Sequence, residues 1–221
     1  MVLATFPVEP GALDRFVPPG VSLDLWEGQA LASVVGLRFH DTRLLGCPVP
    51  LHRHFPELNL RFYVRRATPD GTRHGVVFLR EIVPRRAVAV LARALYNENY
   101  IRRPLRSVVE PGRKVAYEWR CGRVNRLAVE LRGEPALVEP ESLESFLLDH
   151  LWGYTKTRSE GCMEYRVTRE PWRVVPVESY EFDVDAACSF GPELKGLLRG
   201  RPTSVIYAEG SPVSVSFGRR T

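Results

Sequence analysis

Apolar and polar residues alternate along several stretches of this chain, and that spacing predicts β-strands. In the segment FPELNLRFYVRR, every second residue from Leu58 to Val64 is apolar, whereas the residues between them are polar. Because successive side chains of a strand point to opposite faces, this pattern predicts a strand over 57–66 with one apolar and one polar face. The turn-forming PDG at 69–71 predicts an antiparallel partner over 74–83.

The same reasoning predicts further strands elsewhere in the chain. A nearly continuous apolar run predicts a strand over 29–39 that is buried on both faces. Alternation predicts strands over 114–121, 125–132, 162–169 and 179–186, and two short strands near the C-terminus.

Two segments have helical spacing instead. Apolar residues after Pro84 predict a helix over 85–96, and a proline followed by acidic residues begins a second predicted helix over 140–154. No regular strand–helix–strand alternation is present, which disfavours a parallel sheet. We therefore expect one α+β domain over 1–221, with a predominantly antiparallel curved sheet or barrel and two main helices.

Composition agrees with a globular protein. Hydrophobic residues make up 44% of the chain and charged residues 26%. The opening residues do not resemble a secretion signal, and no apolar run approaches the roughly 18 residues of a membrane helix, so we expect a cytoplasmic protein without a membrane partner. Four cysteines without a CxxC pair predict buried free thiols, with a long-range disulfide as the alternative; they are Cys47, Cys121, Cys162 and Cys188.

The polar positions of 57–66 are the first candidate site. Glu57, Asn59, Arg61 and Tyr63 share one face of the predicted strand. Glu57 and Arg61 lie about 13 Å apart along a strand, so they do not form a local ion pair. An arginine can clamp an anion, an amide and a phenol can donate hydrogen bonds, and a glutamate can act as a base. The alternative is an ordinary solvated strand face.

Other motifs carry less information. His52 and His54 form an HxH pair without an identifiable third ligand, and His40, His74 and His150 are isolated in sequence, so no metal or cofactor is predicted. The chain has no GxSxG, P-loop or GxGxxG motif. The net charge is +5, but basic residues are scattered among acids, which disfavours nucleic-acid binding.

The order of several motifs resembles a known family. ELNLRFYV, then HGVVFLR and LARALYNENY, follow an opening FVPPGVSLDLWEGQALASVVGLRF, and SLESFLLDHLWGYT and EPWRVVPV come later. Together they resemble the YqjF-like family of unknown function, which is similar in fold to acetoacetate decarboxylases. The resemblance implies a curved antiparallel sheet around a small-molecule cavity.

The resemblance also implies a set of site residues. Glu57 matches the active-site glutamate of the decarboxylases and Arg93 matches a helix arginine, but Asn99-Tyr100 stands where a Pro-Lys is expected. Without that lysine, Schiff-base decarboxylation is not expected. The implied cavity lining is the polar face of 57–63 closed by further residues, which are Arg93, Tyr96 and Tyr100.

These observations predict a protein that binds a small anionic or carbonyl-bearing metabolite in a barrel cavity. Glu57 is the candidate catalytic residue, and whether the protein is an enzyme is left open. The alternative is a non-catalytic ligand-binding or scaffold protein that forms a homo-oligomer. An arginine-rich nucleic-acid binder is the less favoured third interpretation.

Overall fold

The computed structural model describes residues 1–44, 47–48, 53–84, 99–157 and 161–221. The strands and α-helices are β1 (Val2–Val8), β2 (Ser22–Leu23), β3 (Ala30–Phe39), β4 (Arg43–Leu44), β5 (Cys47–Pro48), β6 (Phe55–Thr68), β7 (Gly71–Val83), β8 (Tyr100–Arg102), β9 (Leu105–Glu110), β10 (Lys114–Cys121), β11 (Arg123–Leu131), β12 (Ala136–Leu137), α2 (Leu143–Leu148), β13 (Trp152–Lys156), β14 (Cys162–Arg169), β15 (Arg173–Val175), β16 (Val177–Asp183), α3 (Ala186–Phe190), β17 (Ser204–Ala208), β18 (Val213–Val215) and β19 (Arg219–Arg220). Short 3-10 turns lie at η1 (Pro10–Ala12), η2 (Asp14–Phe16) and η3 (Pro192–Leu197).

A large sheet dominates the fold, in the order β12-β15-β17-β1-β3-β6-β7-β13-β14-β18. The predicted strands 57–66, 74–83 and 29–39 are confirmed as parts of β6, β7 and β3. The sheet is mixed rather than purely antiparallel, because β7 pairs in parallel with both β13 and β8. The structure is mostly sheet with few helices. Because the strand order is an open path, a closed antiparallel barrel is not confirmed.

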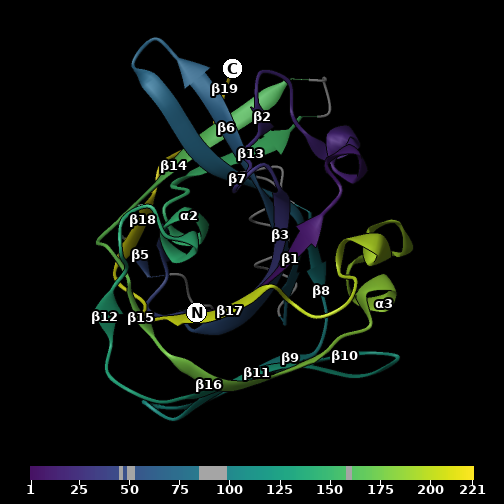
Figure 1. The fold of residues 1–221 in the computed structure, drawn as a ribbon, viewed down its shortest axis with the longest axis vertical. Helices are drawn as coiled ribbons and strands as arrows, with labels where there is room; N and C mark the ends of the chain where they lie inside the picture. Colours follow the sequence, from purple (N-terminus) through teal and green to yellow (C-terminus); the bar gives the residue numbers. More distant parts are fainter. Residues whose placement is uncertain (45–46, 49–52, 85–98, 158–160) are drawn as a thin grey trace.

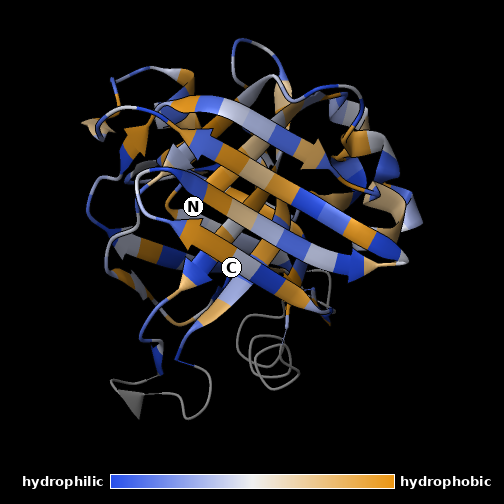
Figure 2. Cartoon of the chain, turned by 90° about the horizontal axis from the view of Figure 1, so that it is seen from below, coloured by the Kyte–Doolittle hydropathy of each residue, from blue (hydrophilic) through white to orange (hydrophobic). Residues whose placement is uncertain are grey.

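A second sheet, in the order β16-β11-β10-β9, packs against one side of the large sheet (Figure 1). Its strands alternate hydrophobic and hydrophilic residues, as Figure 2 shows. The main core lies between the two sheets and includes Leu60 and Phe62 of β6 with Tyr117 and Trp119 of β10. We call the side of β6 that joins this core, from Leu58 to Val64 at even numbers, the outer face. The apolar half of the alternation is therefore buried between two sheets.

The opposite side of the large sheet curves around α2 (Figure 1). A separate core lies there, in which Leu147 and Leu148 of α2 join Tyr63 and Val35. We call the side of β6 that carries Glu57, Asn59, Arg61 and Tyr63 the inner face. Helix α2 therefore covers the end of this polar strand face that carries Arg61 and Tyr63.

The second predicted helix is shorter than expected. Helix α2 covers only Leu143–Leu148, with the Ser142 hydroxyl accepting a hydrogen bond from the Ser145 backbone N–H at 3.1 Å. Residues from Trp152 onward form β13, where Gly153 lies under the ring of Tyr165 so closely that a Cβ would be 2.1 Å from it. Strand pairing therefore overrides the local helical pattern. The first predicted helix, 85–96, lies outside the described residues.

The prediction of free thiols is wrong for one pair of cysteines. Cys121 of β10 and Cys188 of α3 form a disulfide with their Cα atoms 5.8 Å apart. Cys162, by contrast, is a buried free cysteine, as predicted. The disulfide connects α3 to the four-stranded sheet across 67 residues of sequence. No local sequence motif predicts this pairing.

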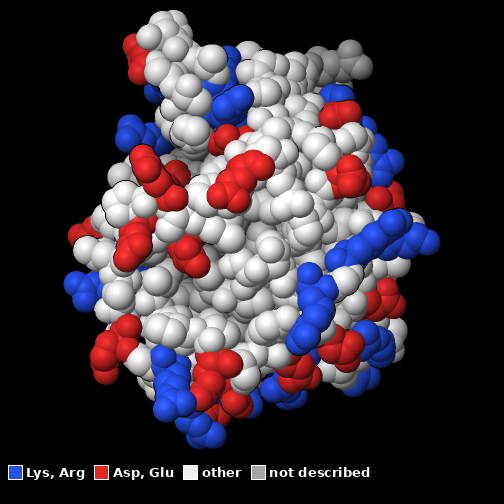
Figure 3. Space-filling view, viewed as in Figure 1, with Lys and Arg blue, Asp and Glu red and all other residues white. Residues whose placement is uncertain are grey.

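The molecular surface mixes charges of both signs. On the face shown in Figure 3, acidic and basic side chains are interspersed. Among the described residues, no helix has the length and apolar character that a membrane span requires.

Candidate functional site

The inner face of β6 is buried, so the alternative of a solvated strand face is wrong. The exposed fractions are 3% for Glu57, 1% for Asn59 and 1% for Tyr63, and Arg61 is half-buried. Buried polar groups need partners, because leaving them unpaired costs free energy. The partners of these side chains divide the inner face into three parts.

Glu57 is at the centre of the first part. The Asn59 amide donates to its Oε1 at 3.2 Å, and the Tyr100 hydroxyl donates to its Oε2 at 3.0 Å. Burial raises the pKa of the Glu57 carboxyl to about 7, although both hydrogen bonds act in the opposite direction. A carboxyl with such a pKa can take up or release a proton near neutral pH.

A second carboxyl, which the sequence reasoning missed, belongs to this group. Glu81 of β7 is buried and lies opposite Asn59 in the β6–β7 register and opposite Tyr100 in the β7–β8 register. A β-bulge puts it there: Arg61 pairs with Phe78 and Leu60 with Arg80, so Leu79 is an extra residue. Strict alternation along β7 from His74 would have assigned Glu81 to the other face. We call Glu57, Asn59, Glu81 and Tyr100 the Glu57 cluster.

Arg61 forms the second part, next to the end of α2. Its guanidinium donates to the Leu147 carbonyl at 3.1 Å and lies 5.6 Å from the centre of the Tyr63 ring. Arg169, which the sequence reasoning also missed, donates to the Leu148 carbonyl at 2.6 Å. Burial lowers the pKa of Arg169; Asp149 raises it, and the neighbouring charge of Arg61 lowers it again. Two guanidinium groups therefore lie near one another at the end of α2.

Tyr63 begins the third part. Its hydroxyl is 2.7 Å from the Ser33 hydroxyl, which in turn is 2.8 Å from that of Thr5, so a hydrogen-bonded chain crosses three neighbouring strands. The Tyr63 ring meets the His150 ring edge-on, with 4.9 Å between centroids. The side chain of Tyr63 is thus linked to Ser33 and His150 rather than to Glu57.

His150 and His74 are isolated in sequence, but the fold brings them together at Asp24. His150 Nε2 lies 3.0 Å and His74 Nδ1 lies 2.5 Å from the same oxygen, Asp24 Oδ2. Burial raises the pKa of Asp24, but its hydrogen-bonding contacts with His150 and His74 outweigh burial, so the pKa lies below its ordinary value. The three residues are far apart in sequence, and no spacing motif signals their meeting.

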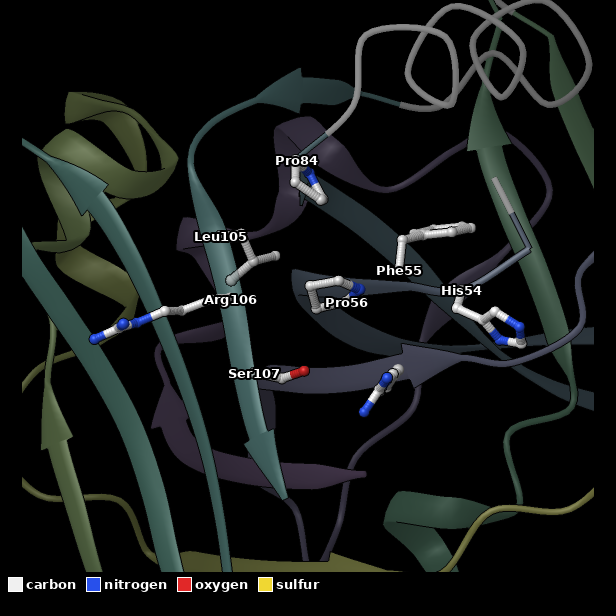
Figure 4. A pocket seen from close by; sticks show the side chains of 8 residues that line it. His54, Phe55, Pro56, Pro84, Leu105, Arg106 and Ser107 are labelled. Atoms are coloured by element: carbon white, nitrogen blue, oxygen red, sulfur yellow. The ribbon is translucent and has the colours of Figure 1, made fainter. Parts of the chain in front are cut away.

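An open cavity of about 360 Å³ lies at the start of β6. Figure 4 shows Leu105 and Ser107 of β9 on one side of it and His54 and Phe55 on the other. Glu57 does not line this cavity, but Phe55 packs with Tyr100, which binds Glu57. The cavity is therefore next to the Glu57 cluster without containing it.

The remaining predicted residues have different outcomes. Arg93 and Tyr96 lie outside the described residues. All three lysines of the chain are described: Lys114 pairs with Glu130 at 3.4 Å, whereas Lys156 and Lys195 are exposed. The expectation against Schiff-base chemistry stays a prediction.

The family of the chain follows from its sequence. Residues 1–212 match the model of the DUF2071 family, described as an uncharacterized conserved protein. The chain belongs to this family. A relative from Bacillus subtilis, the uncharacterized protein YqjF, is 27% identical over 184 residues, which cover 81% of this chain and 74% of the relative. The resemblance to the YqjF-like family is thus confirmed.

Solved structures extend the comparison of this DUF2071 member to its fold. Acetoacetate decarboxylase from Legionella pneumophila superimposes with a TM-score of 0.66 at 12% identity, covering all of this chain and 83% of the other. The enduracididine biosynthesis enzyme MppR with HEPES bound gives 0.65 at 14% identity, covering 99% and 84%. MppR has also been solved in complex with pyruvate, with a TM-score of 0.60. These likenesses show an acetoacetate decarboxylase-like fold.

Proposed function

We propose that this protein binds a small carboxylic acid that also has a carbonyl group, along the inner face of β6, and that Glu57 exchanges a proton with it. The observation that carries this proposal is the Glu57 carboxyl, which is buried, held by two hydrogen-bond donors, and has a pKa of about 7. Perturbed carboxyls of this kind are typical of functional sites.

Unpaired polar atoms on the inner face support a ligand there. Within the described part of the chain, the Asn59 Oδ1 and the Arg61 Nε are buried and have no hydrogen-bond partner. Arg61 also has no carboxylate partner among the described residues, although a half-buried guanidinium needs a compensating charge. A ligand carboxylate near Arg61 and Arg169 would supply that charge.

The Glu57 cluster would act on the carbonyl end of such a ligand. Because Glu57 and Arg61 lie about 13 Å apart along β6, the ligand carbonyl and carboxylate must be separated by a chain of several carbons. A carbon–hydrogen bond next to the carbonyl breaks, its proton goes to the Glu57 carboxylate, and the electron pair moves to the carbonyl oxygen as an enolate. Once Glu57 has taken up the proton, the Tyr100 hydroxyl can turn its single hydrogen from Glu57 Oε2 to that oxygen. Return of the proton restores the ligand. This chemistry needs no lysine, and Schiff-base decarboxylation forms no part of the proposal.

Binding is tested with the linear keto acid 7-oxooctanoate as the probe and glycerol as the control solute, using thermal shift and ligand-observed NMR. The keto acid should raise the melting temperature of the wild type, and glycerol at the same concentration should not. Arg61→Gln should weaken binding of the keto acid at least about tenfold, because a charge-assisted hydrogen bond is lost. Arg65→Gln, which removes an exposed arginine from the same strand, is the matched control and should bind like the wild type.

Proton exchange is tested separately, by following deuterium incorporation at the carbons next to the ketone of 7-oxooctanoate in heavy water by NMR. Glu57→Gln should abolish exchange but leave binding measurable, whereas Glu178→Gln, at an exposed glutamate, should change neither. Binding without exchange in the wild type would favour the non-catalytic alternative. Absence of 7-oxooctanoate binding, or an equal response of wild type and Arg61→Gln, would overturn the proposed site. A covalent adduct on Lys114 after borohydride reduction would overturn the argument against a Schiff base.

A further inference from the structure

Three segments far apart in sequence meet at one end of the inner face. Asp24 follows β2, and its backbone N–H donates to the Tyr63 carbonyl at 3.0 Å, which fixes it against β6. His74 comes from β7, and His150 lies just after α2. One ligand-type atom from each residue lies within 4.8 Å of the others. The described residues thus bring one carboxylate and two imidazoles together, with their potential metal-ligand atoms close to one another.

The hydrogen bond from His150 to the Phe146 carbonyl decides which ring nitrogen carries the hydrogen and which one has a lone pair facing Asp24. Nδ1 lies 2.6 Å from the Phe146 carbonyl oxygen, which can only accept, so Nδ1 carries a hydrogen. In a neutral imidazole the other nitrogen, Nε2, then has a lone pair. That lone pair faces the Asp24 Oδ2 at 3.0 Å, so a cation is needed between two electron-rich atoms. The cation is either a proton or a metal ion.

The surroundings of His150 match those of a metal-binding histidine. Such histidines usually donate their second ring N–H to a backbone carbonyl or a carboxylate, which fixes the tautomer and the ring orientation. The Phe146 carbonyl has this role here. The side chains of His150 and Asp24 are only 3% and 6% exposed, and the rings of Tyr63 and Phe146 contact the imidazole edge-on at 4.9 and 4.7 Å. Two of the three groups are therefore held rigidly before any ion arrives.

We propose that Asp24, His74 and His150 form a binding site for a divalent transition-metal ion of the zinc class. Two imidazoles and one carboxylate are a ligand set that suits Zn²⁺ and also Fe²⁺. Three protein ligands leave a fourth position for water or a substrate atom, as in zinc sites that carry out chemistry. The open position lies on the side of His74, whose side chain is 50% exposed.

The geometry admits an ion after a small movement of His74. Zinc bonds of about 2.0–2.1 Å in a tetrahedron hold their ligand atoms roughly 3.3 Å apart. His150 and Asp24 are close to that separation at 3.0 Å, whereas His74 and Asp24 are nearer, at 2.5 Å. Because the His74 side chain is exposed, its ring can turn outward to make room, and the two buried ligands need not move.

This site is separate from the Glu57 cluster. Tyr63, which touches His150, comes six positions after Glu57 on the same strand, a distance of about 20 Å. The inference therefore does not depend on the proposed reaction, and either can fail without the other.

The test is metal binding by the full chain after removal of metals with a chelator. Zn²⁺ is titrated by calorimetry, and Co²⁺ is added as a probe whose visible absorption reports its coordination. Wild-type protein should bind one Zn²⁺ per chain, and NMR signals of the His74 and His150 rings should shift during the titration. His74→Ala changes an exposed side chain and should fold normally, yet weaken binding at least about tenfold. Asp24→Asn should weaken it further.

His40→Ala is the matched control, because His40 is exposed and lies outside the group. It should bind Zn²⁺ like the wild type. Absence of stoichiometric binding in the wild type would overturn the metal site and leave a proton between His150 and Asp24. Binding that survives His74→Ala, or that is lost in His40→Ala, would also overturn it, because the ion would then be held elsewhere. Circular dichroism of each variant confirms that the fold is intact.

Discussion

Both faces of β6 are largely buried, yet they are built from opposite kinds of side chain. On the outer face, Leu58, Leu60 and Phe62 are completely inaccessible to solvent within the core between the two sheets. On the inner face, Glu57 and Asn59 are almost as inaccessible but hold one another by hydrogen bonds. One strand thus contributes to an apolar core on one side and to a polar, titratable interior on the other.

The contrast between the two faces shows that burial alone does not determine how a side chain affects stability. Burial of apolar side chains stabilises the fold by an amount that depends on area and packing and hardly on pH. Burial of a carboxyl stabilises or destabilises according to its protonation state and its partners. We therefore expect the outer face to dominate stability and the inner face to make it depend on pH. Three substitutions test this contrast.

The largest effect is expected from Leu60→Ala on the outer face. Removing a fully buried leucine should lower the free energy of unfolding by about 2–5 kcal/mol, because it leaves a cavity between the sheets. The loss should be the same at acidic and neutral pH, as measured by urea unfolding. Val124→Ala, at a half-exposed position, should cost about 0.5 kcal/mol or less. A loss for Leu60→Ala that small would show that the outer face is loosely packed.

Glu57→Gln should have the next largest effect, and its size should depend on pH. Because the folded-state pKa of about 7 lies above the ordinary 4.5, the folded protein binds this proton more tightly than the unfolded chain. The resulting stabilisation is complete below pH 4.5 and is lost as the pH rises through 7. Over that interval the wild type should lose roughly 3 kcal/mol that Glu57→Gln does not lose.

The measurement is urea unfolding of both proteins across that pH range. Relative to the wild type, Glu57→Gln should gain stability steadily as the pH increases. The control is Glu178→Gln, where the side chain is 50% exposed, and the wild-type slope should remain. Equal differences between Glu57→Gln and wild type at all pH values would contradict the raised pKa of Glu57.

Tyr63→Phe should have the smallest effect of the three. The substitution removes the hydroxyl that bonds Ser33 but keeps the ring against His150, so the expected loss is about 1 kcal/mol. In a double-mutant cycle, Ser33→Ala should cost less when combined with Tyr63→Phe than in the wild type, because the partner hydroxyl is already absent. Additive losses would indicate that the hydrogen bond contributes nothing to stability.

Much of β6 could be predicted from sequence, because alternation is a local property of the chain. The pattern from Glu57 to Val64 assigns each side chain to a face without reference to any other segment. The buried strand β3 was likewise recognisable from its continuous apolar run. Only the family resemblance implied that Tyr100 lies near the polar face, and its hydrogen bond to Glu57 comes from the structure.

Other features could not be predicted in this way. The end of the predicted helix 140–154 forms strand β13 instead, because pairing with β14 outweighs local helix propensity. Glu81 joins the Glu57 cluster only through the bulge at Leu79, which interrupts the alternation of β7. The disulfide joins residues 67 positions apart, and His150 meets Asp24 across 126 positions.

The sequence by itself determined that β6 has an apolar and a polar face, because apolar and polar residues alternate along it with the two-residue period of a strand. Only the tertiary structure decided that the polar face is enclosed, that Glu81 lies opposite Asn59 on the neighbouring strand, and that two histidines share Asp24. Those outcomes depend on strand register, a bulge and the position of α2, which are set by packing between distant segments. The charge, pKa and ligands of a buried group follow from those neighbours.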